Sequence, residues 1–297
     1  MNSAETESPW VAAMPAIFVL IWSTGFIVAR FGMPHAPPFS FLAWRYALSI
    51  VGLLIWVTLA RVPWPKDGQW KHLCVTGALM HAGYLGGVWA AVKGGMGAGL
   101  AALIVGLQPV LTALWVAHRG GQVHLRQWLG LALGLTGLTL VIWDRLGSGA
   151  VTWGNSAWIT LGLLSITAGT LYQKRFIKPC DVRSANAVQL MAAWVVSLPL
   201  VWMETEAVVW NAESMGAMAW SVLALTIGAS SLLYLLIQRG AATSVASLMY
   251  LVPPCTAVLA WLLFDEPLGA RVLVGVAITA MGVWWVVRQA AKPGEKS

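Results

Sequence analysis

Residues 243–288 read TSVASLMYLVPPCTAVLAWLLFDEPLGARVLVGVAITAMGVWWVVR, and the first half of the chain contains a diverged copy of this segment. Residues 99–117 align with residues 243–261 without a gap, and residues 126–143 align with residues 271–288 after a shift of one position in the loop. Pro, Gly and Arg recur at fixed spacing, so we predict an internal duplication of the whole chain. The identical pairs include Ala102/Ala246, Leu107/Leu251, Pro109/Pro253, Thr112/Thr256, Ala113/Ala257, Arg126/Arg271, Gly130/Gly275 and Gly137/Gly282.

The composition is that of a polytopic membrane protein. Hydrophobic residues make up 59% of the 297 residues and charged residues only 10%, whereas a soluble domain carries about 25% charged residues. The 19 Trp and 30 Gly are also typical of membrane helices. The net charge of +7 is therefore expected to report on membrane orientation and not on nucleic-acid binding.

Ten apolar runs of about 17–23 residues each have a length that crosses the hydrocarbon core as a helix. The loops between them are short, so consecutive helices should be antiparallel neighbours, and there is no room for a soluble domain. The runs lie at residues 10–29, 39–60, 70–92, 98–117, 126–143, 157–174, 185–203, 215–237, 243–264 and 270–288.

The distribution of Lys and Arg predicts the orientation. If the N-terminus is cytoplasmic, the outside loops hold only Arg30, Lys93, Arg145 and Arg271, and most other basic residues fall inside. Both termini are therefore predicted to be cytoplasmic. Five helices per half is an odd number, so two homologous halves must insert with opposite topology, as inverted repeats do.

We therefore predict an all-α membrane protein of ten transmembrane helices, arranged as two inverted five-helix repeats in the plasma (inner) membrane. Residues 1–9 would form a cytoplasmic tail, residues 10–150 the first repeat, residues 151–288 the second repeat, and residues 289–297 a second cytoplasmic tail.

The sequence resembles a known family over nearly its whole length. The stretches that carry the resemblance are LYLLIQRGAATSVASLMYLVPPCTAVLAWLLF at residues 233–264 with the following DEP, IWSTGFIVARFG at residues 21–32, FLAWRY at residues 41–46 and TLYQKRF at residues 170–176. They are similar to EamA-type members of the drug/metabolite transporter superfamily, most of all to the amino-acid and drug exporters of the YddG type. The resemblance implies a ten-helix inverted-repeat carrier that moves small metabolites or drugs, mostly outward.

One departure from the family pattern lies at residues 116–121 (VAHRGG). Many members carry an acidic turn there, like residues 264–266 of this chain. A role for Glu266 is therefore not expected to be mirrored in the first half.

Carboxylates are missing from the middle of every predicted span. All 11 Asp and Glu fall in tails, in loops or at span ends. A proton-driven carrier of cations usually needs a carboxylate inside the membrane, because a buried charge needs a partner. This absence favours facilitated, gradient-driven export.

The candidate substrate-binding residues are the basic and polar side chains inside the spans. Arg45 could bind a substrate carboxylate through its bidentate fork, or its side chain could extend to the outer headgroups. His81 and Tyr84 share one helical face near mid-membrane and either line a cavity or bond a neighbouring helix. Ser23 and Thr24 either contact substrate or bond the backbone carbonyl one turn back.

Further candidates flank the helix-breaking prolines or are aromatic. Pro109, Pro253 and Pro254 free carbonyl groups at membrane depth, which can bind polar ligands or act only as structural hinges that bend the helix. The remaining candidates for the substrate site are Trp22, Trp89, Gln108, Tyr234 and Tyr250.

We predict a secondary transporter, not an enzyme, that exports small metabolites by alternating access around a central cavity. Amino acids with aromatic or apolar side chains are the expected substrates, and the first, third, fourth, sixth, eighth and ninth helices the expected walls. The alternatives are a broad-specificity drug exporter of the same fold, a non-transporting receptor and an intramembrane enzyme. The sequence shows no catalytic constellation, metal-ligand spacing or cofactor motif. The partners would be a small molecule and the lipid bilayer, with no nucleic acid, and the expected state is a monomer.

Overall fold

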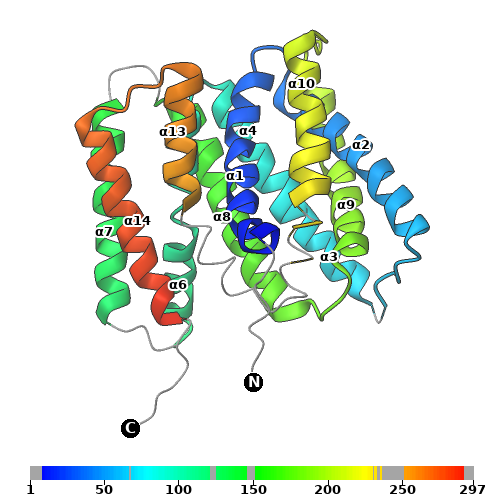
Figure 1. Cartoon of the computed structure of the whole chain (residues 1–297), viewed down its shortest axis with the longest axis horizontal. Coiled ribbons are helices and arrows are strands. Elements are labelled where there is room, and N and C mark those ends of the chain that lie inside the picture. Colours follow the sequence, from blue (N-terminus) through cyan, green and yellow to red (C-terminus); the bar gives the residue numbers. More distant parts are fainter. Residues whose placement is uncertain are drawn as a thin grey trace.

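The computed structural model describes residues 9–66, 68–120, 125–145, 151–229, 231–232, 235 and 251–290. Every regular element in this part of the chain is a helix, so the predicted all-α class is confirmed (Figure 1). The elements are α1 (Pro9–Gly32), α2 (Pro38–Leu59), α3 (Gln69–Gly77), η1 (Ala78–Gly83), α4 (Tyr84–Lys93), α5 (Ala98–Val105), α6 (Gln108–His118), α7 (Leu125–Arg145), α8 (Trp153–Phe176), α9 (Val182–Met203), α10 (Ala212–Trp220), η2 (Ser221–Gly228), α13 (Val252–Phe264) and α14 (Ala270–Ala290).

Helices with the length and apolarity of membrane spans recur through the described residues. Five stretches qualify, at Ala13–Gly32, Pro38–Leu59, Gln69–Lys93, Ala98–Trp115 and Val182–Met203, and the apolar helices at α7, α13 and α14 are shorter. Parts of the predicted eighth and ninth spans lie outside the described residues. Several spanning helices in one chain make a multi-pass membrane protein.

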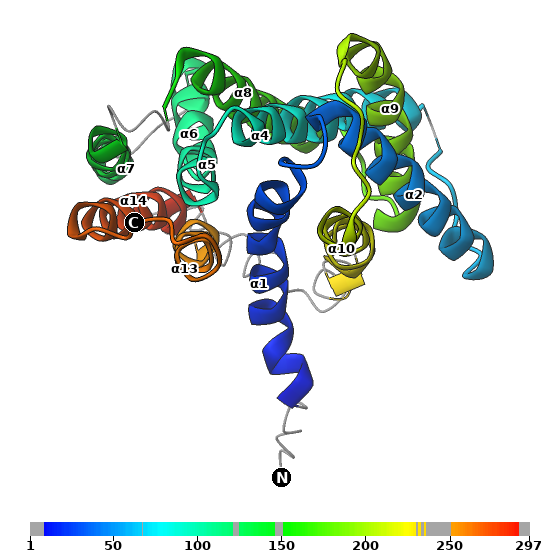
Figure 2. The same ribbon diagram turned by 90° about the horizontal axis from the view of Figure 1, so that it is seen from above.

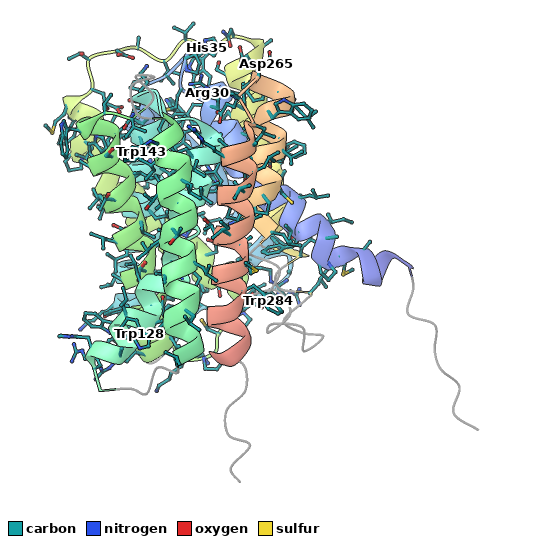
Figure 3. All side chains as sticks on the ribbon, turned by 90° about the vertical axis from the view of Figure 1, so that its left-hand side faces the viewer. Arg30, His35, Trp128, Trp143, Asp265 and Trp284 are labelled. Atoms are coloured by element: carbon teal, nitrogen blue, oxygen red, sulfur yellow. The ribbon has the colours of Figure 1, made fainter. Side chains whose placement is uncertain are left out.

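Exposed tryptophans mark the two ends of α7 (Figure 3). Trp128 is 45% exposed and Trp143 is 70% exposed, and 15 residues of helix separate them by about 22 Å. Trp side chains prefer the two headgroup regions of a bilayer. Their spacing therefore places α7 across the membrane with its outer face toward lipid.

Two predicted spans are divided at their centres. The third consists of α3, the π-helix η1 and α4, and the fourth consists of α5 and α6. Pro109 lies in the first turn of α6. The N–H groups of a first turn make no bond within the helix, so the N–H that proline lacks costs no helical hydrogen bond there. Pro253 and Pro254 likewise occupy the first turn of α13. All three prolines thus stand at the start of a separate helix.

The antiparallel helices α7 and α14 are the most closely packed pair (Figure 1). A Cβ atom added to Gly137 would collide with the Gly275 carbonyl, and one added to Gly282 would collide with the Gly130 carbonyl. These are the glycines that the internal alignment pairs as Gly130/Gly275 and Gly137/Gly282. Each contact therefore maps onto the other when the two halves are exchanged, as a two-fold axis requires.

Seen from above, α1 lies between two groups of helices (Figure 2). One group contains α5, α6, α7, α13 and α14, and the other contains α2, α9 and α10, while α4 and α8 run between them along one side. The largest fully buried side chains include Phe41, Tyr46, Trp89, Met96 and Leu103. They come from α2, α4, the following loop and α5, which places the densest packing around the candidate site.

Candidate functional site

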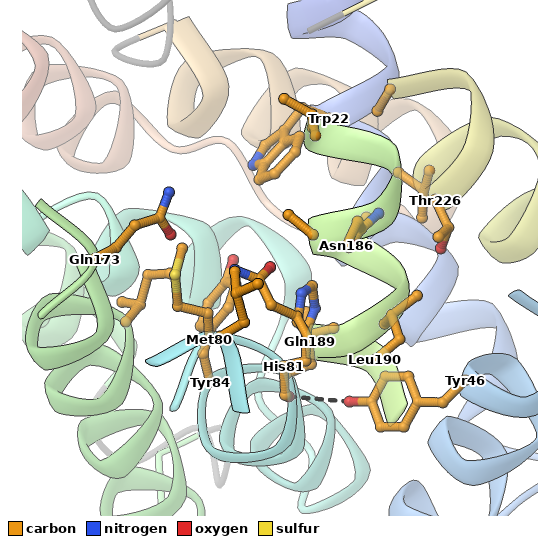
Figure 4. A pocket seen from close by; sticks show the side chains of 18 of the residues that line it. Trp22, Tyr46, Met80, His81, Tyr84, Gln173, Asn186, Gln189, Leu190 and Thr226 are labelled. Carbon is orange, nitrogen blue, oxygen red and sulfur yellow. Dashed lines mark hydrogen bonds between the residues drawn. The ribbon is translucent and has the colours of Figure 1, made fainter. Parts of the chain in front are cut away.

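A cavity of about 530 Å³ opens between the two groups of helices. This volume lies within the range of small-molecule sites. Its walls come from α1, α2, the α3–η1–α4 span, α8, α9 and η2 (Figure 4). The expected walls included the fourth and ninth spans and omitted the second and seventh. The omission of the second and seventh spans was wrong, because Arg45 on α2 and Gln189 on α9 line the main cavity. Among the described residues, α5, α6 and α13 do not line it, and residues 243–250 of the ninth span lie outside those residues.

The mouth of the cavity is basic. Lys174, near the end of α8, and Lys178, in the following loop, line it together with Pro179 and Cys180. The neighbouring carboxylate of Asp181 caps α9 and accepts two side-chain hydrogen bonds from Arg183, at 2.9 and 2.7 Å. These bonds hold the pKa of Asp181 below its usual value, so the carboxylate stays ionised and paired.

Arg45 lies at the closed end of the cavity. It stands seven residues after the first residue of α2, about 10 Å along the helix axis. Its side chain is only 8% exposed and lines the cavity. The guanidinium carbon lies 6.0 Å from the centroid of the Trp89 ring. Within the described residues no hydrogen bond or ion pair reaches this guanidinium.

The imidazole of His81 and the ring of Tyr84 line the same wall (Figure 4). The Tyr46 hydroxyl donates a 2.9 Å hydrogen bond to the His81 carbonyl. The Gln189 side chain lines the cavity beside His81 (Figure 4) and donates to the Thr76 hydroxyl at 3.0 Å. One hydrogen bond thus ties the His81 backbone to α2, and another ties α9 to α3.

Two π-helical segments face the cavity. The segment η1 carries His81, and η2 carries Thr226, which also lines the cavity. The Thr226 hydroxyl donates to the Ser221 carbonyl five residues back, at 3.0 Å. A π-helix displaces the usual backbone pairing and is frequent at functional sites. The two segments fall at matching positions in the third and eighth predicted spans.

A smaller cavity of about 120 Å³ adjoins the first. Trp22 and Tyr84 line both cavities, and Gln108, Pro109 and Pro253 line the smaller one. The Gln108 amide donates to the Thr170 hydroxyl at 2.8 Å, so its nitrogen is already bonded to α8.

The predicted site residues divide into three groups. Trp22, Arg45, His81, Tyr84 and Trp89 come together around the main cavity, and Gln108, Pro109 and Pro253 lie at the smaller one. Ser23, Thr24 and Pro254 line neither cavity. Tyr234 and Tyr250 lie outside the described residues.

The hydroxyls of Ser23 and Thr24 are bonded within the protein. Ser23 is fully buried and donates to the Val19 carbonyl at 2.8 Å. Thr24 donates to the Ile21 carbonyl at 2.6 Å and accepts a 2.8 Å hydrogen bond from the Trp220 indole. Local backbone bonding of this kind is common for hydroxyls in membrane helices.

Sequence reasoning missed Tyr46, Asn186, Gln189 and Thr226, all of which line the main cavity. A signal for two of them was present. Asn186 and Gln189 are polar residues three apart in an apolar run, so they share one helical face. Tyr46 and Thr226 carry no comparable signal, because single hydroxyl residues are common in membrane helices.

Carboxylates close the opposite end of the molecule. Glu204, at the end of α9, accepts hydrogen bonds from the backbone N–H groups of Phe39 and Ser40 at the start of α2, at 2.8 and 2.7 Å. Glu266, after α13, accepts from the N–H of Ala98 at the start of α5, at 2.8 Å. Such carboxylates satisfy unpaired amides and favour the helix dipole.

An exposed ion pair lies at the same end. The Lys93 ammonium donates to Glu206 at 2.6 Å and to the Met33 carbonyl at 3.2 Å. His35 lies 2.9 Å from Glu213. The lining of the main cavity thus reaches Lys174 and Lys178, and among the described residues it includes neither Glu204 nor Glu266.

Comparison with known proteins agrees with this architecture. A solved crystal structure matches the fold with a TM-score of 0.63 at 18% identity, over 95% of this chain and 98% of the other. An uncharacterized transporter of Archaeoglobus fulgidus is 26% identical over 274 residues, which cover 91% of this chain and 94% of the relative.

Two relatives come from Escherichia coli K12. The uncharacterized inner membrane transporter YedA is 26% identical over 281 residues, covering 93% of this chain and 88% of YedA. A probable amino-acid metabolite efflux pump is 24% identical over 301 residues, covering 94% and 96% of the two chains. The model of the EamA-like transporter family matches residues 9–143 and, separately, residues 155–288. This chain is therefore a multi-pass inner-membrane transporter and belongs to the EamA-like transporter family.

Proposed function

We propose that this transporter is a secondary carrier that exports small metabolites, among them amino acids with aromatic or apolar side chains, by alternating access. The observation that carries the proposal is a cavity of about 530 Å³ whose lining runs from Lys178 in the loop after α8 inward to Arg45 and Trp89. Its walls combine aromatic rings (Trp22, Tyr84, Trp89) with a few polar groups, as small-molecule sites do. One relative in Escherichia coli is named a probable amino-acid metabolite efflux pump.

The architecture we propose is ten helices in two inverted repeats with both termini cytoplasmic. Three observations support it. The family model matches each half of the chain separately. The glycine contacts between α7 and α14 follow a two-fold axis. The π-helical segments η1 and η2 occur at equivalent places in the two halves. With the basic loops inside, the mouth at Lys174 and Lys178 faces the cytoplasm.

Alternating access follows from the two ends of this cavity. In the inward-open arrangement the substrate enters past Lys174 and Lys178 and reaches His81 and Tyr84. Release to the outside requires α2 and α5 to separate from Glu204 and Glu266, which bond their first turns. Rocking of one group of helices against the other around a fixed central site would do this. The turns before Pro109 and Pro253 are the proposed hinges.

Reconstitution into liposomes tests this function. We expect saturable counterflow of labelled phenylalanine and leucine above that of empty vesicles. His81→Ala and Tyr84→Phe should lower the flux about tenfold while the protein elutes as a single species. His72→Ala is the matched control, because His72 bonds Tyr172 outside the cavity. Normal flux in both cavity variants would show that the substrate does not bind in this cavity.

The same liposome assay also distinguishes the proposed carrier from a drug exporter and from a receptor. Saturable transport of a lipophilic cation such as tetraphenylphosphonium, without amino-acid transport, would identify a drug exporter. Binding of amino acids without flux would identify a receptor.

A further inference from the structure

Arg45 is a buried positive charge without a counter-ion among the described residues. Its side chain is 8% exposed and lines the cavity. The Trp89 ring, with its centroid 6.0 Å from the guanidinium carbon, and the neighbouring Tyr46 and Tyr84 are uncharged partners. A buried charge that lacks a partner is costly in a membrane protein. An extension of the side chain to the headgroups is not what the structure shows, because a side chain this buried does not reach the lipid surface.

The rest of the cavity is also positively charged or neutral. Lys174 and Lys178 line the mouth, His81 lines the wall, and no Asp or Glu lines either cavity within the described residues. Asp181, beside the mouth, is bonded to Arg183. Residues 236–250, which the structure does not describe, contain no Asp or Glu either.

We infer that the carrier selects small monocarboxylates with a net negative charge and an aromatic or apolar group, and that Arg45 is the residue that sets this selectivity. The inference rests on the proposed transport function and narrows its substrate class. The guanidinium offers a fork that matches a carboxylate in bidentate geometry, and Trp22, Tyr84 and Trp89 supply apolar surface. A monoanion neutralises Arg45, whereas a zwitterion brings an ammonium group that no lining carboxylate among the described residues can pair. Zwitterionic amino acids are therefore the poorer substrates.

This selectivity also provides a driving force that needs no proton-carrying carboxylate. Arg45 stays with the protein, so each anion that crosses moves one negative charge. A potential of 100 mV then supports an accumulation ratio of about 50-fold for a monoanion at equilibrium. A potential that is negative inside the cell drives the anion outward, which is the direction of export, and does not act on a zwitterion.

A charge series on one side chain tests the inference. The probes are N-acetylphenylalanine, phenylalanine and phenylalaninamide, which carry charges of −1, 0 and +1 at pH 6.5. The protein is reconstituted in phosphatidylcholine vesicles, and initial counterflow rates are measured at equal concentrations. Uptake is then followed with an inside-positive potential of about 100 mV set by potassium and valinomycin. Accumulation at equilibrium does not depend on the orientation of the protein in the vesicle.

We expect the anion to exchange at least tenfold faster than phenylalanine, with phenylalaninamide at the level of empty vesicles. Only the anion should accumulate in response to the potential. Arg45→Gln should abolish the advantage of the anion, and Arg45→Lys should keep the order of the three probes. Lys71→Gln removes a positive charge from an exposed position outside the cavity. This control should change neither the rate advantage of the anion nor the order of the three probes.

The outcomes are distinguishable. Phenylalanine flux equal to or above that of its acetylated form overturns the charge selectivity and leaves the transport function intact. Absence of flux for all three probes, with the wild-type protein monodisperse, contradicts the transport function as well. An unchanged charge order in a monodisperse Arg45→Gln variant removes the role of Arg45. If that variant does not fold, Arg45→Lys and the wild-type series decide the question.

Discussion

Arg45 and Tyr46 are neighbours in α2 and line the same cavity, yet their side chains do different work. The Arg45 guanidinium has no hydrogen-bond partner among the described residues, so its donors are available to a ligand. The Tyr46 hydroxyl is committed to the His81 carbonyl at 2.9 Å. The π-helix η1 disturbs the backbone pairing around His81. The Tyr46 hydroxyl, which belongs to α2, therefore supplies the His81 carbonyl with a hydrogen-bond donor from another helix.

Tyr46→Phe should therefore lower the stability of the protein and alter the position of the His81 backbone, without creating a cavity in the core. The ring stays in place, and the loss of one hydrogen bond to a buried carbonyl costs about 1 kcal/mol. Thermal unfolding in detergent should show a lower midpoint, and transport should fall because the His81 segment loses its tie to α2. Tyr172→Phe, which removes a hydroxyl bonded to His72 outside the cavity, is the control. An unchanged midpoint and unchanged flux would show that the bond is not needed.

At the scale of elements, the contact between α7 and α14 depends on glycine. Without a Cβ atom, the backbones approach until Gly137 meets the Gly275 carbonyl and Gly282 meets the Gly130 carbonyl. Small residues are the usual means of close helix packing in membranes, where the lipid is as apolar as the side chains. The sequence alignment had already paired these glycines between the halves.

Gly137→Leu and Gly282→Leu should each separate these helices. A Cβ at either position collides with backbone atoms, which cannot rotate away as a side chain can. We expect each variant to lose about 1–3 kcal/mol of stability, the usual cost of overpacking, seen as a lower thermal midpoint. Gly216→Leu, at a position with nothing within 4 Å of an added Cβ, is the control. Equal midpoints in all three variants would contradict the close approach.

The carboxylates of Glu204 and Glu266 act on helix starts and should bias the carrier toward its inward-open state. Loss of a helix cap typically costs about 1 kcal/mol, so Glu266→Ala or Glu204→Ala should raise the outward-open population about fivefold. Val88 is buried and lines the main cavity. A Val88→Cys probe, in a background without native cysteines, therefore reports the outward opening. The measured quantity is its reaction rate with an impermeant thiol reagent added outside.

The matched control for this opening is Glu206→Ala. Glu206 lies in the loop after Glu204 but pairs with Lys93 in an exposed contact, with its own side chain 62% exposed, and exposed pairs contribute little. A labelling rate that rises as much in Glu206→Ala as in Glu266→Ala would show that charge alone, and not capping, holds this end closed.

For the whole molecule, the last described turn of α14 lies at the same end as the loop after α8, which lines the cavity mouth (Figure 1). The positive-inside rule predicts that this end is cytoplasmic. Single cysteines introduced at residues 61–66 should therefore resist an impermeant thiol reagent applied to intact cells. Cysteines introduced at residues 204–211 should react. Labelling of residues 61–66 from outside would reverse the orientation.

Energy coupling is also a property of the whole cycle. With no carboxylate lining the cavity among the described residues, the imidazole of His81 is the cavity group best suited to carry a proton through the cycle. We expect an imposed pH step, with the membrane potential clamped, to drive no accumulation of a zwitterionic amino acid in proteoliposomes. Concentrative uptake that follows the pH step and vanishes in His81→Gln would show proton coupling instead.

Much of this protein could be predicted from its residues. Apolar length, charge placement and the repeated Pro and Gly spacing depend on local composition and on the dimensions of a bilayer. They predicted a helical multi-pass membrane protein and the candidates Arg45, His81 and Tyr84 of the main cavity, whereas the transporter family was implied by the resemblance of whole stretches of sequence. Each of these conclusions needs only the solvent that a residue prefers or the face of a helix on which it falls.

The tertiary structure alone decided which side chains meet. Ser23 and Arg45 are both polar residues inside apolar runs, and only the packing shows that the Ser23 hydroxyl is bonded to its own backbone while Arg45 faces a cavity. The place of the predicted seventh span in the cavity wall and the π-helical conformation of η1 and η2 appear only in the structure. Sequence periodicity predicts which face of a helix is apolar, but it does not predict what packs against that face. The reason is that the lipid and another helix present equally apolar surfaces.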